Sequence, residues 1–525
     1  MSSVHLLTRL IAPILLIPVA ASWAVTADDI RQRLANAEPD SLMVVGEPLR
    51  SGAAVVDFYR ENDWQRVWTH GPASTVHLTE LVNEIRASAE HGFLPEHYHV
   101  AALTDPRTDD LSLELLATDA FLTQVRHRAL GVVSPTTLDQ DWYLPRGDVP
   151  AVEVLTGALE ENAVAATLAA LWPKQADYRA LLAKRQALLA ATGTEPATVP
   201  SGSLLQYGQR GRRVLALKNR LLGPGRHTSV FDDTLLEAVL DFQAAMGLNT
   251  DGLVGETTLS MLNADRDFWL DTVDANLERW RWLPDDLPSS YLIINIAAFE
   301  LRVVDQGWEM MRMRVIVGQP ARRTPTFSQT LKYLVYNPIW VVPFEMAAKD
   351  KLRELKHDPI RMALQGYEAK RTGTNYFVPV DTIDWRQVSR ETFHYELRQL
   401  PGPNNALGRI KFMLPNRFAV YLHDTPDQEL FDQQQRDFSS GCIRLANPFG
   451  LADWVLRHDG QAEAAATMRE LLAGGETHTV YLNTPLPVLV VYFTAYADEI
   501  GEVMFRRDHY QRDREIVRAL RGNGG

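Results

Sequence analysis

Cysteine is almost absent from this chain, which has only one, Cys442, among 525 residues. A lone cysteine excludes an intramolecular disulfide and a zinc site built from cysteine pairs. The sequence also lacks a metalloprotease-type histidine motif and a phosphate-binding glycine loop. Three histidines lie close together, at His91, His97 and His99, but no neighbouring Asp, Glu or Cys completes a recognisable ligand spacing. We interpret that cluster as an ordinary loop beside a helix.

Positive charge is also in deficit, with 53 Lys and Arg against 66 Asp and Glu, for a formal net charge of −13. Binding to nucleic-acid phosphates needs clustered Lys and Arg, so we expect no nucleic-acid partner. The hydrophobic fraction of 46% is enough for large buried cores. The length suggests roughly three domains.

Long hydrophobic runs are scarce, and the clearest one is N-terminal, Leu10–Val25 after Arg9, interrupted by Pro13 and Pro18. It is short for a membrane span, and small residues at candidate cleavage points follow. We predict that residues 1–27 are an export signal, with an uncleaved inner-membrane anchor as the alternative. An oxidising compartment makes a free thiol prone to unwanted oxidation, which disfavours a solely structural Cys442.

The first half of the chain has helical spacing of apolar residues. We predict a helical scaffold over residues 28–190, a Thr, Pro, Gly and Ala-rich linker over 191–203, and a compact three-helix module over 204–265. In the module, Leu235, Val239, Phe242 and Met246 recur at helical steps.

The second half changes to alternating apolar residues, which predict many short strands in a domain over residues 289–500. Residues 344–408 interrupt it with a helical piece and irregular chain, which indicates either a lid or binding loop or a structural subdomain. Residues 501–525 form a C-terminal tail. The predicted fold class is therefore α+β and multidomain.

Cys442 lies in the segment Ser-Ser-Gly-Cys-Ile-Arg-Leu, and His423 ends an alternating apolar run nineteen residues earlier, with Phe418–Leu422 as the expected strand. A free thiol is mostly protonated at neutral pH and needs a neighbouring base to attack a carbonyl. Each residue alone is typical of a structural role, a small buried thiol or a satisfied strand histidine. Together, beside Gly441 and Arg444, they favour a thiol nucleophile with an imidazole base.

Small residues precede the thiol. Ser439, Ser440 and Gly441 would let a substrate carbonyl approach the backbone, where the N–H groups of Gly441 and Cys442 could stabilise an oxyanion. Arg444 either holds a substrate carboxylate or forms a structural ion pair. Asn447-Pro448 predicts the start of a helix that fixes this turn.

The cysteine segment, preceded by Tyr-Leu-His-Asp, resembles the active-site signature of the YkuD-type L,D-transpeptidases. The commoner family form has His where this chain has Ser440; a large-enzyme branch shares that departure. Leu400–Gly408 and the tail from Thr479 also resemble that branch. The module, with Asp251–Leu259 at its end, resembles the three-helix peptidoglycan-binding module of cell-wall enzymes.

The resemblance implies a reaction. Cys442 would attack the bond between diaminopimelate and D-alanine in a tetrapeptide stem of peptidoglycan and form a thioester, with His423 transferring protons. An amine of a second stem would resolve it as a 3→3 cross-link. A backbone carbonyl or Ser439 would orient His423. We also assign Asn337, Trp340 and Tyr421, with Arg444, to substrate binding.

The resemblance further implies a periplasmic location, no metal or organic cofactor, and acylation of the thiol by carbapenems. The sequence leaves open whether the acceptor is a stem, a lipoprotein lysine, a D-amino acid or water. It also leaves open any association with the membrane or with other wall-synthesis enzymes.

Three other interpretations are kept. Water as acceptor would make the protein an L,D-carboxypeptidase. A cysteine peptidase or amidase acting on other bonds is disfavoured, since papain-like enzymes place the cysteine before the histidine and this chain reverses that order. A wall-binding scaffold without chemistry is the third.

Overall fold

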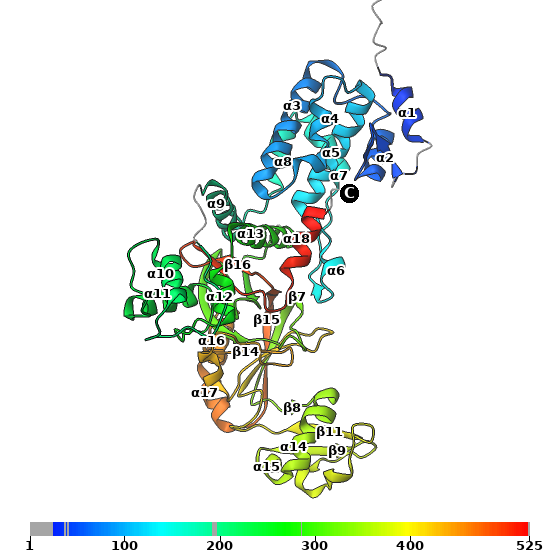
Figure 1. Ribbon diagram of the computed structural model, residues 1–525. Coiled ribbons are helices and arrows are strands. Elements are labelled where there is room, and N and C mark those ends of the chain that lie inside the picture. The colour runs from blue at the N-terminus through cyan, green and yellow to red at the C-terminus, as the bar shows by residue number, and fades with distance from the viewer. Residues whose placement is uncertain (1–24, 36–37, 39–40, 192–196, 285, 523–525) are drawn as a thin grey trace, which may run out of the picture. The chain divides into compact units, whose positions relative to one another are not determined.

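The computed structural model describes residues 25–35, 38, 41–191, 197–284 and 286–522 and divides into two compact units (Figure 1). The first unit runs to Ile85 and adds Tyr98–Thr123 and Ala151–Thr167; the second comprises Arg86–His97, Gln124–Pro150 and the chain from Leu168 onward. The predicted export signal falls almost entirely on residues 1–24, outside the described residues. Among the described residues, no helix combines the length and apolar content needed to cross a membrane.

The first unit is mainly helical, as predicted for this part of the chain. Trp68, in the aromatic segment, donates from its indole to Thr118 Oγ1 at 2.9 Å, inside a core that includes Phe121. Its elements are α1 (Ala27–Ala35), β1 (Met43–Val44), β2 (Glu47–Pro48), α2 (Gly52–Glu61), α3 (Gly71–Ala87), α4 (Val100–Thr104), α5 (Asp110–Leu130), α7 (Ala151–Glu160) and α8 (Val164–Ala170), of which α3, α5 and α8 end in the second unit.

The second unit contains the last part of the predicted scaffold. Its helices outside the module and the insertion are η2 (Ser88–His91), η3 (Pro95–Tyr98), α6 (Pro135–Leu138), α9 (Ala176–Ala190), α13 (Arg266–Arg281), η7 (Gln428–Asp432), α16 (Pro448–His458), α17 (Ala462–Gly474) and α18 (Asp513–Gly522). The contacts therefore place α9, which the sequence assigned to the scaffold, with the second unit.

The module consists of α10 (Arg212–Leu222), α11 (Asp233–Ala245) and α12 (Glu256–Leu262). Asp232 is the N-cap of α11 and accepts from Leu235 N at 3.2 Å, which satisfies one of the free donors at the helix start. Val214, Leu217, Leu235 and Val239 pack in its own core. From the predicted linker, Val199 joins this core and exchanges two hydrogen bonds with the Asn263 side chain.

The predicted β-rich domain is built on a sheet with the strand order β12-β13-β14-β6-β5-β4-β15-β7-β3, and β12 also pairs with β7, so the sheet closes on itself. The β13–β14 and β4–β15 pairs are parallel. The strands are β3 (Trp142–Tyr143), β4 (Ser290–Asn295), β5 (Glu300–Asp305), β6 (Trp308–Ile316), β7 (Thr326–Tyr336), β12 (Ile410–Met413), β13 (Leu422–His423), β14 (Ile443–Leu445) and β15 (His478–Val491).

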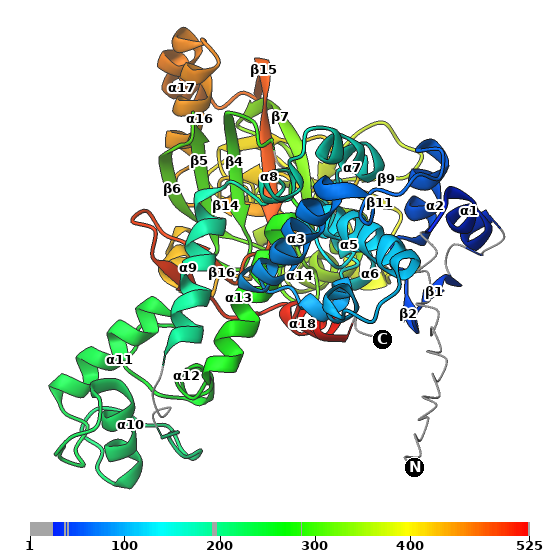
Figure 2. The ribbon, with the colours of Figure 1, turned by 90° about the horizontal axis from the view of Figure 1, so that it is seen from above.

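Alternation along the strands gives this sheet two apolar faces. In β4, Leu292 and Ile294 point into a core shared with Phe412 and Leu422, whereas Ile293 points the opposite way. Helices α9 and α13 cover that outer face, where α13 contributes Val273, Leu277 and Trp280 (Figure 2). Each fully buried side chain of this kind contributes about 2 kcal/mol. The sheet is therefore a rigid base for the segments around β13 and β14.

One expected strand is shorter than predicted. Strand β13 comprises Leu422–His423, and the preceding residues bend because the Asn416 side chain accepts from Phe418 N at 3.0 Å and from Val420 N at 3.2 Å. Ala419 takes a left-handed backbone with φ of 54°. The Asn416 side chain therefore takes the place of a neighbouring strand as the hydrogen-bond acceptor for the N–H groups of Phe418 and Val420.

The long insertion is a small subdomain with its own core, which includes Leu355, Trp385 and Leu397. Its strands form the sheet β10-β9-β11-β8. Its elements are β8 (Trp340–Val341), the π-helical η4 (Met346–Lys351), α14 (Leu352–His357), α15 (Pro359–Leu364), β9 (Tyr367–Arg371), β10 (Val378–Pro379), η5 (Val380–Thr382), η6 (Trp385–Gln387) and β11 (Tyr395–Gln399). The subdomain begins earlier than the predicted residue 344, because β8 (Trp340–Val341) pairs with its strand β11.

The segment predicted as a tail is structured over its described residues. Strand β17 (Val503–Phe505) pairs with β16 (Ala495–Ala497), and α18 follows. Tyr510, between them, is buried in the core of the closed sheet.

Candidate active site

Cys442 lies at the end of a tight turn that leads into β14. Ser439 Oγ donates to the Cys442 carbonyl at 2.5 Å and accepts from Gly441 N at 3.1 Å. Gly441 has a φ of 113°, a backbone conformation that favours glycine. The buried Ser439 side chain therefore stabilises the turn through these two hydrogen bonds.

A second layer of contacts holds this turn from the sheet side. Thr324 Oγ1 donates to the Gly441 carbonyl and accepts from Gly318 N, both at 2.9 Å. The Tyr510 hydroxyl donates to the Gly318 carbonyl and accepts from Thr324 N at 3.2 Å. A side-chain carbon at Gly318 would collide with the Arg322 backbone carbonyl, so glycine is needed there. The C-terminal segment thereby fixes the nucleophile turn.

Strand register puts the histidine on the same face as the thiol. In the parallel β13–β14 pair, His423 is opposite Arg444, and Ile443 N donates to the Tyr421 carbonyl at 3.1 Å. Alternation then directs the side chains of Tyr421, His423, Cys442 and Arg444 to one face. Lys411, opposite His423 in β12, joins them. The face therefore carries a thiol, an imidazole, a phenol and two cationic side chains.

His423 is held in one tautomer. It is buried, and its Nδ1 lies 2.5 Å from the backbone carbonyl of Asp424. A carbonyl can only accept, so Nδ1 carries the proton and Nε2 keeps its lone pair. Burial, together with the positive charges of Arg444 and Lys411, lowers the pKa of His423 to about 3. The imidazole is therefore neutral, with an unprotonated Nε2. The sequence left either a backbone carbonyl or Ser439 as the group that orients His423. The structure places a backbone carbonyl, that of Asp424, in contact with the His423 ring.

Cys442 is partly exposed, and its Sγ lies 3.6 Å from the Ala419 carbonyl. Burial of its surroundings raises the pKa of the thiol above its ordinary value, while hydrogen bonds from Tyr421 and the charges of Lys411 and Arg444 oppose that rise. The thiol and the imidazole thus share one face of the β13–β14 pair, and burial favours the neutral form of each. A neutral thiol needs the base to take its proton as the sulfur attacks.

Tyr421 connects the thiol to the insertion. Its side chain hydrogen-bonds to Cys442 and also to Trp340 of β8, and burial is the first cause of its raised pKa. The Lys411 ammonium lies over its ring, 3.9 Å from the centroid. Tyr421 packs against the core of the insertion, in which Trp340 is buried. Two residues that we assigned to substrate binding are thus linked to the thiol. Tyr421 contacts Cys442 directly, and Trp340 contacts Tyr421.

The other two predicted substrate-binding residues are engaged by the protein. Arg444 Nη1 donates to Asp427 Oδ2 at 2.9 Å, an ion pair of the kind that the sequence left as an alternative. The buried Asn337 amide donates to three backbone carbonyls at the end of α17, those of Leu471, Leu472 and Glu476, at 3.1–3.2 Å. A contact of either residue with substrate stays a prediction.

Ser440, which stands where the commoner family form has histidine, contacts an arginine instead. Arg322 Nη1 donates to Ser440 Oγ at 3.0 Å and to Asp350 Oδ2 at 2.6 Å. Asp350 belongs to η4 of the insertion. One guanidinium thus joins the nucleophile turn to the insertion.

Sequence reasoning missed several residues around the thiol: Lys411, Thr324, Tyr510 and Arg322. Lys411 carried a weak signal, since it is a lone charge between Ile410 and Phe412 in an apolar strand. The others come from segments far from Cys442 in sequence, and no local pattern marks them.

Comparisons with known proteins bear on this domain. Residues 289–482 match the family model of the L,D-transpeptidase catalytic domain of YkuD type. Residues 210–262 match a model provisionally described as a peptidoglycan-binding domain, and residues 53–184 match a scaffold domain. The family resemblance seen in the cysteine segment is therefore confirmed, and so is the predicted combination of a helical region, a helical module and a β-rich catalytic domain.

A Haemophilus influenzae protein provisionally named as an L,D-transpeptidase is 33% identical over 241 residues, which are 46% of this chain and 48% of that protein. The chain thus spans about half the length of this curated relative. Among solved structures, an L,D-transpeptidase from Mycobacterium smegmatis is 16% identical over 38% of this chain and 58% of its own, with a TM-score of 0.18. One from Xylanimonas cellulosilytica is 15% identical over 55% and 98%, with a TM-score of 0.16.

Proposed function

We propose that this protein is an exported, periplasmic peptidoglycan L,D-transpeptidase whose nucleophile is Cys442 and whose general base is His423. The observation that carries the proposal is the shared face of β13 and β14, where the thiol and an imidazole protonated at Nδ1 lie within the region that matches the L,D-transpeptidase catalytic domain. The proposed substrate is a tetrapeptide stem of the wall. The matched peptidoglycan-binding module supports a wall polymer as the partner.

In the acylation step, the Cys442 sulfur attacks the diaminopimelate carbonyl that is linked to D-alanine. The thiol proton passes to His423 Nε2, and the carbonyl oxygen becomes an oxyanion. Because the Gly441 N–H donates to Ser439 Oγ, the Cys442 N–H is the donor of this turn that we assign to the oxyanion. Collapse expels D-alanine, whose amine takes the proton from His423, and leaves a thioester.

In the second step, an amine of another stem attacks the thioester. His423 accepts a proton from that amine, the new amide forms, and the sulfur leaves as a thiolate that regains the proton from the imidazolium. The product is a 3→3 cross-link. Tyr421 is assigned the role of stabilising the sulfur as it gains charge, because its side chain hydrogen-bonds to Cys442. The same thiol is the proposed target of carbapenems.

The experiment is incubation of purified protein with a disaccharide-tetrapeptide, with products resolved by mass. Loss of D-alanine with formation of a dimer is the expected result, and Cys442→Ala should abolish it, by on the order of 10⁴-fold or more. Release of D-alanine with tripeptide as the sole product would reassign the protein as an L,D-carboxypeptidase. Cleavage of unrelated L-peptides alone, or turnover by Cys442→Ala, would overturn the assignment.

The alternative function, a wall-binding scaffold without catalytic activity, predicts a different result in a labelling experiment. Intact mass after exposure to a carbapenem should show an adduct on the native chain and none on Cys442→Ala. The lack of an adduct on either protein, together with no turnover, would favour the scaffold.

A further inference from the structure

Lys411 is a half-buried cation on the catalytic face, and among the residues that the structure describes it has no acidic partner. It lies in β12 opposite His423 in β13. Its ammonium makes no hydrogen bond or ion pair with the described part of the chain, and its contact is the Tyr421 ring, whose centroid is 3.9 Å away. The nitrogen is not among the unpartnered atoms that are sealed from solvent, so a ligand can reach it.

Two other cations near the thiol differ from Lys411, because a carboxylate already holds each of them. Arg444 Nη1 donates to Asp427 Oδ2 at 2.9 Å. Arg322 Nη1 donates to Asp350 Oδ2 at 2.6 Å. Of these three cations, Lys411 is the one whose charge no described carboxylate compensates.

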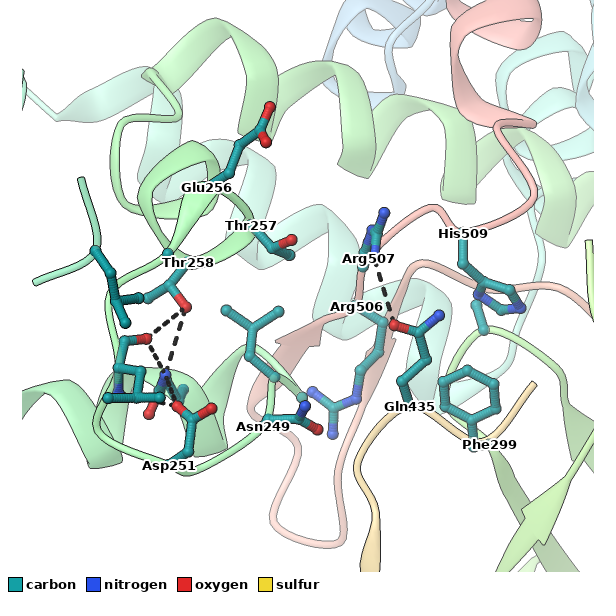
Figure 3. Close-up of a pocket in the computed structure, with 17 residues that line it drawn as sticks. Asn249, Asp251, Glu256, Thr257, Thr258, Phe299, Gln435, Arg506, Arg507 and His509 are labelled. Carbon is teal, nitrogen blue, oxygen red and sulfur yellow. Dashed lines mark hydrogen bonds between the residues drawn. The ribbon is translucent and has the colours of Figure 1, made fainter. Parts of the chain in front are cut away.

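Basic side chains elsewhere in the second unit are also engaged, as a pocket of about 260 Å³ between the module and the catalytic domain illustrates (Figure 3). There, Arg506 Nη1 donates to the carbonyls of Ala245 at 3.0 Å and Phe505 at 2.9 Å. Arg507 Nη1 contacts Gln435 Oε1 at 3.4 Å. Both arginines thus have acceptors within the protein.

The unpaired charge of Lys411 is electrostatically unfavourable where it stands. Burial lowers the pKa of Lys411, and the charge of Cys442 opposes that change. The charge of Lys411 also contributes to the lowered pKa of His423. A half-buried cation without a counter-charge is disfavoured by desolvation, and an anion beside it would favour the ammonium form. The face is therefore complementary to an anionic group of a ligand.

The ammonium is also close to the atom that reacts. The Tyr421 side chain hydrogen-bonds to Cys442, and its ring face contacts the Lys411 ammonium. One aromatic side chain therefore separates the sulfur from the cation. When a peptide is attacked at a carbonyl, the carboxylate of a departing C-terminal residue is two bonds from the scissile nitrogen. A carboxylate at that short covalent distance from the attacked bond suits the position of the ammonium.

We propose that Lys411 is a specificity-determining residue that pairs with a substrate carboxylate beside the scissile bond. This inference rests on the proposed function, because it takes the stem tetrapeptide as the substrate. The terminal carboxylate of D-alanine is the assigned partner, since covalent geometry fixes it next to the scissile nitrogen. The second carboxylate of diaminopimelate has the same chemistry but lies at the end of a flexible side chain. Pairing makes the protein select donors that end in a free carboxylate.

A role confined to the sulfur makes a different prediction. The charge of Lys411 lowers the pKa of the Cys442 thiol, against the effect of burial. If this were the whole contribution of the lysine, removing its charge would affect every peptide equally. Pairing instead couples the lysine to one carboxylate of the ligand, and a protein without the thiol still shows that coupling.

The test measures this coupling in the full chain carrying Cys442→Ala, which cannot form the thioester. Calorimetric titration uses a synthetic stem tetrapeptide and the same peptide with its D-alanine carboxylate amidated. Amidation should weaken binding about tenfold or more, because a hydrogen bond between charged groups is lost. After addition of Lys411→Met, which keeps an apolar side chain of similar length, amidation should weaken binding less than threefold.

Two further variants separate this coupling from a general disturbance of the site. Lys411→Gln is neutral and polar, and it should remove the effect of amidation as Lys411→Met does. Lys332→Met makes the same change at an exposed lysine of β7, a strand that pairs with β12, and it should keep the tenfold effect. The amidated peptide should bind all of these proteins with similar affinity, which checks that they are folded.

A third peptide, with lysine in place of diaminopimelate, lacks the second carboxylate. Its loss of affinity should be the same with and without Lys411→Met. If the coupling appears with this peptide and not with the amide, the diaminopimelate carboxylate is the partner and the pairing stands. Absence of coupling with both peptides, or no binding of the tetrapeptide by Cys442→Ala, overturns the proposal.

The outcome is distinguishable from failure of the proposed function. Turnover of the tetrapeptide by the parent chain is measured separately. Coupling without turnover would keep the pairing and remove the transpeptidase activity, whereas turnover without coupling would do the reverse.

Discussion

Two buried histidines in different units of this protein have pKa values shifted in opposite directions. His423, on the catalytic face, has cationic neighbours in Arg444 and Lys411, and burial with those charges lowers its pKa to about 3. His99, in the first unit, lies between Glu47 and Asp119, 2.8 Å from the latter. Burial opposes its charged form, but the hydrogen bonds and charges of those carboxylates raise its pKa above 6.5.

The comparison shows that burial alone does not decide what a histidine does. Neighbouring cations favour the neutral form of the ring, and neighbouring carboxylates favour its protonated form. The sequence placed both histidines near other polar residues, and it was the neighbours brought by the fold that set their roles. Of the three clustered histidines, His99 contacts two carboxylates, whereas His91 lies 2.9 Å from the Tyr178 hydroxyl.

The largest expected effect comes from His423→Gln. A glutamine side chain cannot take the thiol proton, so turnover of a wall tetrapeptide should fall about 10²- to 10⁴-fold. Hydrogen exchange of peptides from the closed sheet should change little. The measurement is the initial rate of D-alanine release. A loss below threefold would remove His423 as the base and leave it with the structural role now given to His99.

His99→Gln should act on stability instead. It leaves Asp119, which is fully buried, with backbone donors from Arg50 and Ser51 but without its imidazole partner. Loss of a bond to a buried charge destabilises by about 2 kcal/mol. Hydrogen-exchange protection of α5 peptides should drop, while the rate of D-alanine release per folded molecule stays within twofold. Unchanged protection would contradict the structural role.

The two histidines should also oppose each other in pH dependence. The folded pKa of His99 is raised, so its contribution to stability is fully present below about pH 6.5 and is lost as the pH rises through the folded pKa. His423 has a folded pKa of about 3, so between pH 6.5 and 3 the unfolded chain takes up a proton that the folded chain does not, and stability falls on acidification. Urea unfolding followed by hydrogen exchange at pH 5.5 and 8.5, in parent and His99→Gln, should show the larger difference at pH 5.5. A larger difference at pH 8.5 would reverse the assignment.

Tyr421→Phe sharpens the catalytic side of the comparison. The phenol hydrogen bond lowers the pKa of the Cys442 thiol, so its removal should raise that pKa further. One unit corresponds to about tenfold in thiolate fraction. The rate of alkylation by iodoacetamide, followed between pH 7 and 10, should shift to higher pH. Tyr376→Phe, an exposed tyrosine of the insertion, is the control.

The smallest effect is expected for Arg322→Gln. This change removes the contact that joins Ser440 to Asp350, while the turn keeps its bonds from Ser439 and Thr324. We expect about a threefold loss of kcat/KM, because partly exposed ion pairs contribute about 0.2–1 kcal/mol. Arg386→Gln, an exposed pair with Asp384 in the insertion, provides the control. An unchanged kcat/KM would mean that the insertion does not act through this arginine.

The sequence alone was enough to predict the strands and helices whose residues alternate or recur regularly. The helical steps through α11 and the helix that begins after Asn447 both follow from local spacing and capping residues. The expected strand at Phe418 failed because one asparagine side chain, Asn416, took the backbone partners. The structured region after residue 500 was missed because its apolar residues are sparse and pack on distant segments.

For the site, the sequence by itself determined which thiol and which imidazole are the candidates for the reacting groups. A lone thiol after small residues and a histidine in a strand are local features, and local features are readable in one chain. Only the tertiary structure decided which charges shift the pKa values of Cys442 and His423 and which residues hold the cysteine turn in place. Strand register brought Lys411 and Arg444 beside His423, and packing brought Tyr510, Thr324 and Arg322 to the turn. Electrostatic interactions depend on distance in space, and no local sequence pattern records the distance between residues in separate segments of the chain.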